Sequence, residues 1–116
     1  MKTLLLLPLA LAAVNALASD EVGPYTFTLS GKAFDERCLK LAAGQSIRYS
    51  FRSSEPVDFN IHAHRGSEVI YPVKQAGVRE SSGTFQADVA EDYCLMWQHT
   101  GTGTAKVEGT LERSTR

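Results

Sequence analysis

Two histidines, His62 and His64, stand one residue apart in a segment where apolar and polar residues alternate strictly. Residues 57–64 read VDFNIHAH, with the apolar side chains at the odd positions. A period of two is typical of a half-buried strand. Both imidazoles are therefore expected on one face, with their Cα atoms about 6.5 to 7 Å apart. Two neutral imidazoles at this spacing suit Zn²⁺ or Cu²⁺.

Further metal ligands are offered by Met96 and His99, which flank Trp97 and Gln98. A thioether and a third imidazole beside His62 and His64 would favour copper, especially Cu(I). Met96 and His99 have opposite parity on one strand, however, so they share a site only if the strand ends or bulges near Gln98. The alternative interpretation is that Met96 and Trp97 belong to the core. His62 and His64 would then be solvated on an exposed sheet face.

A third interpretation needs no metal, because the same strand face could bind a peptide, a sugar or a partner protein. The two histidines would make such binding sensitive to pH between about 5 and 7.5. The candidate ligand-binding residues are Asp58, Asn60, His62, His64, Arg65 and Trp97.

Catalytic motifs are missing from the sequence. It contains no Gly-x-Ser-x-Gly, no Gly-rich phosphate loop before a helix and no His-Glu-x-x-His. Asp58 and His62 share a face, but about 13 Å of extended backbone separates them, so a direct acid–base pair is not expected. We therefore predict a protein without enzymatic activity.

Residues 1–18 resemble a secretory signal peptide. Lys2 precedes an apolar run from Leu4 to Val14, and Ala16-Leu17-Ala18 predicts cleavage before Ser19. No later stretch approaches the roughly 20 apolar residues of a membrane helix. We expect residues 19–116 to form a single domain that is periplasmic or secreted and not inserted in a membrane.

Charge is nearly balanced, with 12 Lys and Arg against 13 Asp and Glu, and loss of the leader removes only Lys2. This balance gives no electrostatic case for binding nucleic acid. The expected partner is a protein or a small ligand. Cys38 and Cys94 are the two cysteines, and pairing is the default in an oxidising compartment. A free thiol or a metal-binding thiolate pair is the alternative.

Short alternating segments separated by turn residues predict an antiparallel β-sandwich of about seven to eight strands. Residues 33–37 are expected as a loop, followed by a brief strand at 38–41. Residues 53–56 are expected to turn the chain back, which would make a hairpin of 46–51 and 57–64. Pro72 favours an edge position or a strand end. The other strands are expected at 25–29, 68–73, 82–87, 93–99 and 105–111.

Two stretches resemble the two halves of a GOLD (Golgi dynamics) domain. In the first, Phe34-Asp35-Glu36-Arg37-Cys38 leads through a glycine turn to residues 46–51 and 57–61. In the second, residues 82–85 and an acidic turn lead to Asp92-Tyr93-Cys94-Leu95-Met96-Trp97. The resemblance implies a jelly-roll-like sandwich with Cys38 joined to Cys94 and a non-catalytic interaction role. The cargo receptors of that family continue into a coiled coil and a membrane helix, and we expect neither in residues 19–116, so we do not carry their trafficking role over.

The sequence thus predicts a small exported binding module, with no required cofactor, that uses the strand at 57–64. The second hypothesis is a periplasmic copper- or zinc-binding protein that uses His62 and His64 with Met96 or His99.

Overall fold

The computed structural model describes residues 22–114, and every regular element among them is a strand. The leader predicted at residues 1–18 lies outside the described residues. Within them, no helix is long and apolar enough to cross a membrane. The six strands are β1 (Gly23–Ser30), β2 (Phe34–Leu41), β3 (Ser46–Arg65), β4 (Glu68–Gln86), β5 (Glu91–His99) and β6 (Thr104–Arg113).

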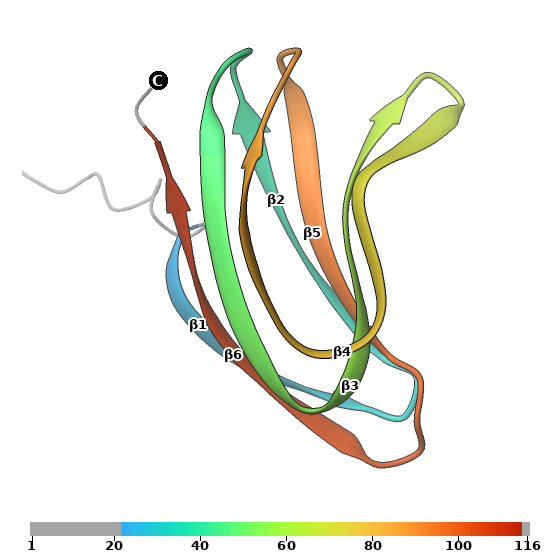
Figure 1. Cartoon of the computed structure of the whole chain (residues 1–116). Helices are drawn as coiled ribbons and strands as arrows, with labels where there is room; N and C mark the ends of the chain where they lie inside the picture. The colour runs from blue at the N-terminus through green and yellow to red at the C-terminus, as the bar shows by residue number, and fades with distance from the viewer. Residues whose placement is uncertain (1–21, 115–116) are drawn as a thin grey trace, which may run out of the picture.

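All strand pairs are antiparallel, in the order β1-β6-β3-β5-β2, and β4 pairs with β3. The long strands β3 and β4 curve together through the whole molecule, so one continuous sheet folds into the two layers of a β-sandwich (Figure 1). The first half of β3 pairs with β6, and the second half pairs with β5. The predicted all-β antiparallel sandwich is confirmed.

The corner of β3 lies at residues 53–56, where we had expected a hairpin turn. The pairing with β4 loses register between Arg52 and Val57, but the chain continues in the same strand. Ser53 Oγ donates a hydrogen bond to the Glu55 carbonyl oxygen (2.6 Å), and Ser54 Oγ accepts one from the Lys106 amide (2.8 Å). The predicted hairpin is wrong because these residues bend the strand from one layer to the other and do not reverse it.

A second irregularity lies in β4, which joins the two strands that were expected at 68–73 and 82–87. Gly77 adopts a φ of 61°, a left-handed conformation that glycine takes without strain, and its amide donates to Asp58 Oδ1 (2.9 Å). Between the pairs Val57–Val78 and Phe59–Gln75, β4 carries one extra residue. The break is therefore a β-bulge within one strand. The two corrections explain why there are six strands and not seven to eight.

Residues 33–37 were expected as a loop, yet β2 begins at Phe34. The strand pairs along its whole length with β5, from Phe34 opposite Gln98 to Leu41 opposite Glu91. This pairing overrides the weak local pattern of the segment. Pro72 lies in β4, which pairs only with β3 among the described strands, so the predicted edge position is confirmed.

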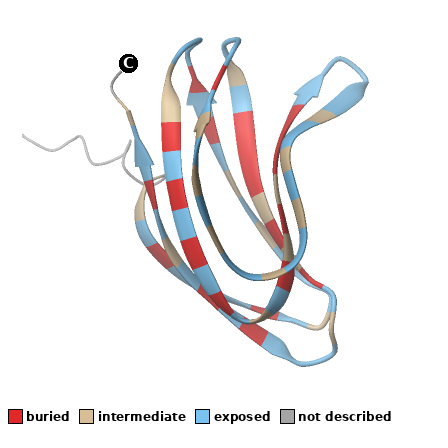
Figure 2. Cartoon of the chain, in the orientation of Figure 1, coloured by how far each residue is buried: buried red, intermediate tan, exposed pale blue. Residues whose placement is uncertain are grey.

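The core lies between the two layers and is centred on Trp97, which is fully buried. Its ring centroid lies 5.3 to 5.9 Å from those of four other aromatic rings, from Tyr25, Phe27, Phe51 and Phe59. Buried and exposed residues alternate along β3 (Figure 2). The core assignment of Trp97 is confirmed, whereas Met96 points the other way and is half-buried.

Candidate ligand-binding site

The predicted polar face of residues 57–64 lies on the outside of the β5-containing layer. Val57, Phe59, Ile61 and Ala63 are at most 1 % exposed, so the side chains between them project outward. The register places Asn60 opposite Met96 and His62 opposite Cys94. The outward face therefore brings side chains of β3 and β5 together.

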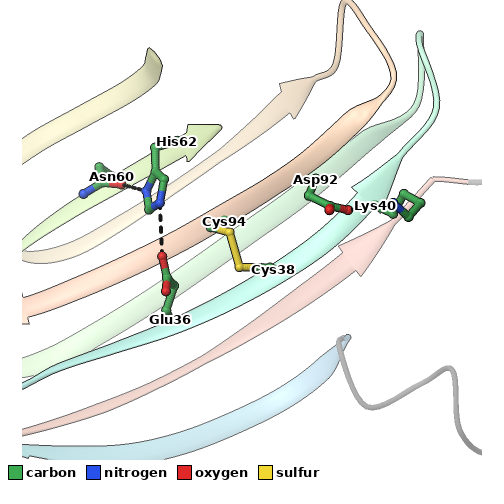
Figure 3. The surroundings of a disulfide bond; sticks show 7 residues. All are labelled: Glu36, Cys38, Lys40, Asn60, His62, Asp92 and Cys94. Atoms are coloured by element: carbon green, nitrogen blue, oxygen red, sulfur yellow. Dashed lines mark hydrogen bonds and ion pairs between the residues drawn. A yellow bond between two sulfur atoms is a disulfide. The ribbon is translucent and has the colours of Figure 1, made fainter. Parts of the chain in front are cut away.

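His62 is buried on this face, with two polar partners (Figure 3). Its Nδ1 lies 2.7 Å from Asn60 Oδ1, and its Nε2 lies 3.1 Å from Glu36 Oε2. A carboxylate accepts hydrogen bonds, and so does an amide oxygen, so the imidazolium form satisfies both contacts at once. The alternative interpretation of a solvated pair is thus wrong for His62, although His64 is exposed.

A bulge in β4 places Tyr71 beside His62. Ile61 pairs with Val73 and Ala63 with Ile70, so β4 has an extra residue opposite His62. The Tyr71 ring centroid lies 5.8 Å from the His62 ring centroid. The ring centroid of His64, which is on the same strand as His62, lies 5.3 Å from the His62 ring centroid. These rings contribute to the burial of His62.

The disulfide between Cys38 and Cys94 lies directly next to His62 (Figure 3). The two half-cystines face each other on β2 and β5, which confirms the predicted pairing. Ligand atoms of Glu36, His62 and Cys94 all lie within 4.8 Å of one another. While the sulfur is oxidised, it offers no thiolate to a metal.

A hollow of about 300 Å³ lies beside this cluster and takes its lining from β3, β4 and β5. Tyr71 is 45 % exposed, and Lys74 Nζ lies 4.5 Å from its ring centroid. Gln75 Oε1 is buried and, among the described residues, has no hydrogen-bond partner. Phe59 also lines the hollow, but its side chain is buried in the core. The other lining residues that offer polar atoms, sulfur or an aromatic ring are Asp58, Asn60, Tyr71, Lys74, Gln75, Met96 and Gln98.

A larger hollow, of about 380 Å³, lies elsewhere and is lined from β3, β4 and β6. Its side chains include Arg52, Glu80 and Glu108, and its one aromatic residue is Phe51, which is buried in the core. It offers no exposed ring on which a ligand could stack. The hollow beside His62 is therefore the better candidate.

Two predicted site residues, Trp97 and His99, point into the core and away from the hollow. Trp97 is fully buried in the core, and His99 is 1 % exposed on the inward face. The His99 ring contacts the Gly31 carbonyl oxygen (2.7 Å) and Glu55 Oε1 (3.1 Å), so it does not join His62 and His64. Met96 and His99 therefore lie on opposite faces of β5, and neither a strand end nor a bulge brings them into one site.

Arg65 lies at the end of β3 and is bound to acidic residues. Its Nη2 lies 2.8 Å from Glu91 Oε1 and 3.5 Å from Asp88 Oδ1. The hydrogen bonds from Arg65 hold the pKa of Glu91 below its usual value. Arg65 therefore ties the end of β3 to the start of β5 and does not line the hollow.

Sequence reasoning missed four residues of the cluster and the hollow: Glu36, Tyr71, Lys74 and Gln75. A period-two pattern does place Glu36 on the same face as Cys38. The sequence contains no sign, however, that β2 lies one strand away from β3, with β5 between them.

No family model matches the sequence, and a search of curated proteins found no match. The GOLD resemblance therefore stays a prediction. Solved structures do share the fold. The pre-peptidase C-terminal domain of a collagenase from Bacillus anthracis is 17 % identical, with a TM-score of 0.63 over 78 % of this chain and 89 % of that one.

Two further structures share the fold but belong to proteins of different kinds. PliG from Aeromonas hydrophila, a periplasmic inhibitor of g-type lysozyme, is 12 % identical, with a TM-score of 0.60 over 87 % of this chain and 93 % of that one. The module TmCBM61, solved with β-1,4-galactotriose, is 10 % identical, with a TM-score of 0.54 over 78 % of this chain and 69 % of that one. At these identities the similarity establishes the β-sandwich fold alone.

Proposed function

We propose that this protein is a non-enzymatic binding module that recognises a short oligosaccharide in the hollow beside His62. The observation that carries the proposal is the lining of that hollow. An exposed aromatic ring, Tyr71, stands among amide, carboxylate and amine side chains from three strands. A concave site with an aromatic surface and a few convergent polar groups is the usual form of a small-ligand site.

The polar groups have the chemistry that sugar hydroxyls need. Hydroxyls both donate and accept, so they pair with the amides of Asn60 and Gln98 and with the ammonium group of Lys74. Gln75 also lines the hollow, and its Oε1 is buried without a hydrogen-bond partner among the described residues. Leaving such an oxygen unpaired costs about 1 to 3 kcal/mol, so rotation of this side chain toward a donor on a ligand would be favoured.

The surroundings of His62 support binding over catalysis. Its two ring nitrogens contact Glu36 and Asn60, and the neighbouring Cys94 is oxidised. Neither contact supplies an activated nucleophile. The similar structures include a carbohydrate-binding module and a lysozyme inhibitor, which agrees with a binding role. The choice of a sugar over a protein rests on the hollow itself.

We also propose that the protein is exported, to the periplasm or outside the cell. The Cys38–Cys94 disulfide supports this location, because disulfides persist mainly in oxidising compartments.

Amide NMR spectra recorded during titration with a panel of soluble oligosaccharides, including β-1,4-galactotriose, test the function. At least one sugar should shift the signals of Asn60, Tyr71 and Gln98. Tyr71→Ala should weaken that binding about 5- to 30-fold, because stacking and burial on one ring contribute about 1 to 2 kcal/mol. Val89→Ala, at an exposed position outside the hollow, is the matched control and should bind normally.

Two results would overturn parts of the proposal. If no sugar shifts these signals at millimolar concentration, the carbohydrate ligand is rejected. If purified g-type lysozyme shifts them instead, the module binds a protein, and only the ligand class was wrong.

A further inference from the structure

Four potential zinc ligands occupy three neighbouring strands next to the hollow. His62, Cys94 and Cys38 form a row across β3, β5 and β2, since His62 is opposite Cys94 and Cys94 is opposite Cys38. Glu36 lies two residues before Cys38 on the same face of β2, and its carboxylate reaches across to His62. Figure 3 shows the His62 and Glu36 side chains meeting beside the disulfide.

The separations fit a zinc ion. Ligand atoms of Glu36, His62 and Cys94 lie within 4.8 Å of one another, and Cys38 Sγ is bonded to Cys94 Sγ. Zinc takes thiolate, imidazole and carboxylate ligands at about 2.0 to 2.3 Å in a tetrahedron, which places the ligand atoms about 3 to 4 Å apart. Once the S–S bond is broken, rotation about the Cα–Cβ bonds of Cys38 and Cys94 can separate the two sulfurs to the spacing of about 3 to 4 Å that zinc ligands require.

We infer that reduction of the Cys38–Cys94 disulfide creates a zinc site formed by Cys38, Cys94, His62 and Glu36. In the oxidised protein only His62 and Glu36 can serve as ligands, and these two side chains already contact each other. The reduced protein offers all four on one face of a sheet. Cys38 is exposed, so a reductant can reach the bond.

The chemical steps balance with a dithiol or phosphine as reductant. The S–S bond takes two electrons and two protons and becomes two thiols, while a dithiol becomes a disulfide or a phosphine becomes its oxide with oxygen from water. Zinc then displaces both thiol protons, and also the second ring proton where His62 is an imidazolium. Binding is therefore accompanied by proton release, and zinc retention opposes reoxidation of the sulfurs.

Paired measurements on the oxidised and the phosphine-reduced protein test the inference. Zinc affinity should rise at least about 100-fold on reduction, because the thiolates supply half of the ligands. Co²⁺ should give the charge-transfer absorption of a cobalt–thiolate bond in the reduced protein only. Circular dichroism of the reduced protein, with and without zinc, reports whether the sheet persists.

Variants identify the ligands and separate this site from zinc capture by an unfolded cysteine pair. In the reduced state His62→Ala should weaken zinc binding about tenfold or more, whereas His64→Ala, at the adjacent imidazole, should not. If His62→Ala does not fold, the ring ¹⁵N signals of His62 in the unaltered protein should still shift with zinc. Equal zinc affinity in the two redox states, absence of the cobalt–thiolate band, or unshifted His62 signals would overturn the inference. None of these measurements involves a sugar, so failure here leaves the proposed function untouched.

Discussion

The imidazole of His62 on β3 lies 3.1 Å from the carboxylate of Glu36 on β2, although β5 runs between the two strands. The contact links three strands on the outer face of one layer. It also fixes the orientation of a ring whose other nitrogen contacts Asn60. The orientation of the His62 ring therefore depends on β2, which lies beyond β5, as well as on its own strand.

Glu36→Gln should lower the free energy of unfolding by about 1 to 2 kcal/mol. The variant replaces a charged acceptor of the buried ring by a neutral one, and hydrogen bonds to charged groups contribute about 1.5 to 3 kcal/mol before partial exposure of Glu36 is allowed for. Urea unfolding at neutral pH measures the change. Glu80→Gln, at an exposed position of β4, is the control and should stay within about 0.5 kcal/mol. Equal stability of Glu36→Gln and the unaltered protein would show that the pair is not stabilising.

Much of the site's orientation was predictable from residues 57–64. Strict alternation correctly placed Phe59 and Ile61 inside and His62 outside, because a sheet with one buried face enforces that register. Parity likewise separated Met96 from His99. These features depend on one strand at a time, and a local pattern is sufficient to find them.

The contact with Glu36 and the corner at 53–56 depend on the fold and were not predictable in the same way. A serine–proline cluster indicates a change of direction, and Ser53 does form a local bond there. Whether the chain reverses or crosses to the other layer depends on which strands it meets. Here β6 pairs with the first half of β3 and β5 with the second half, so the strand continues.

Replacement of both cysteines, in Cys38→Ser with Cys94→Ser, should lower the free energy of unfolding by about 4 kcal/mol. The disulfide closes a loop with a sequence separation of 56, and the chain-entropy model assigns that value to a loop of this length. Guanidinium unfolding of the double variant and of the oxidised protein gives the difference. A loss below about 1 kcal/mol would mean that the reduced chain already holds β2 against β5.

Gly109→Ala should destabilise the protein by about 1 to 3 kcal/mol or prevent folding. An added Cβ would clash with the Ser50 carbonyl oxygen and would lie 2.6 Å from Tyr25 Oη and 2.8 Å from Phe51 Cβ. Backbone cannot move aside as a flexible side-chain end can. Gly103→Ala is the matched control, since its Cβ would meet nothing closer than 3.7 Å. Thermal unfolding should separate the two variants, and equal melting temperatures would contradict the packing argument.

Glu91→Gln should cost stability at neutral pH and little in acid. Hydrogen bonds from Arg65 lower the pKa of Glu91 in the folded protein below its ordinary value of 4.5. A lowered folded pKa gives stability that is present above the unfolded pKa and is lost as pH falls through the folded one. Urea unfolding measures the free energy of unfolding of both proteins at pH 7 and at about pH 2 to 3. The difference between Glu91→Gln and the unaltered protein should be smaller at the lower pH. A constant difference at both pH values would mean that the carboxylate's charge is not responsible.

Trp97, the single tryptophan of the chain, should report on folding and not on the hollow. It is fully buried among aromatic rings, on the opposite face of β5 from Met96, so neither a dissolved quencher nor a ligand in the hollow can touch it. Its fluorescence should resist acrylamide until the protein unfolds. It should also stay unchanged when a sugar shifts the NMR signals of Tyr71. Quenching by that sugar, with the fold intact by circular dichroism, would place the ligand against Trp97 and would contradict the position of the site on the outer face.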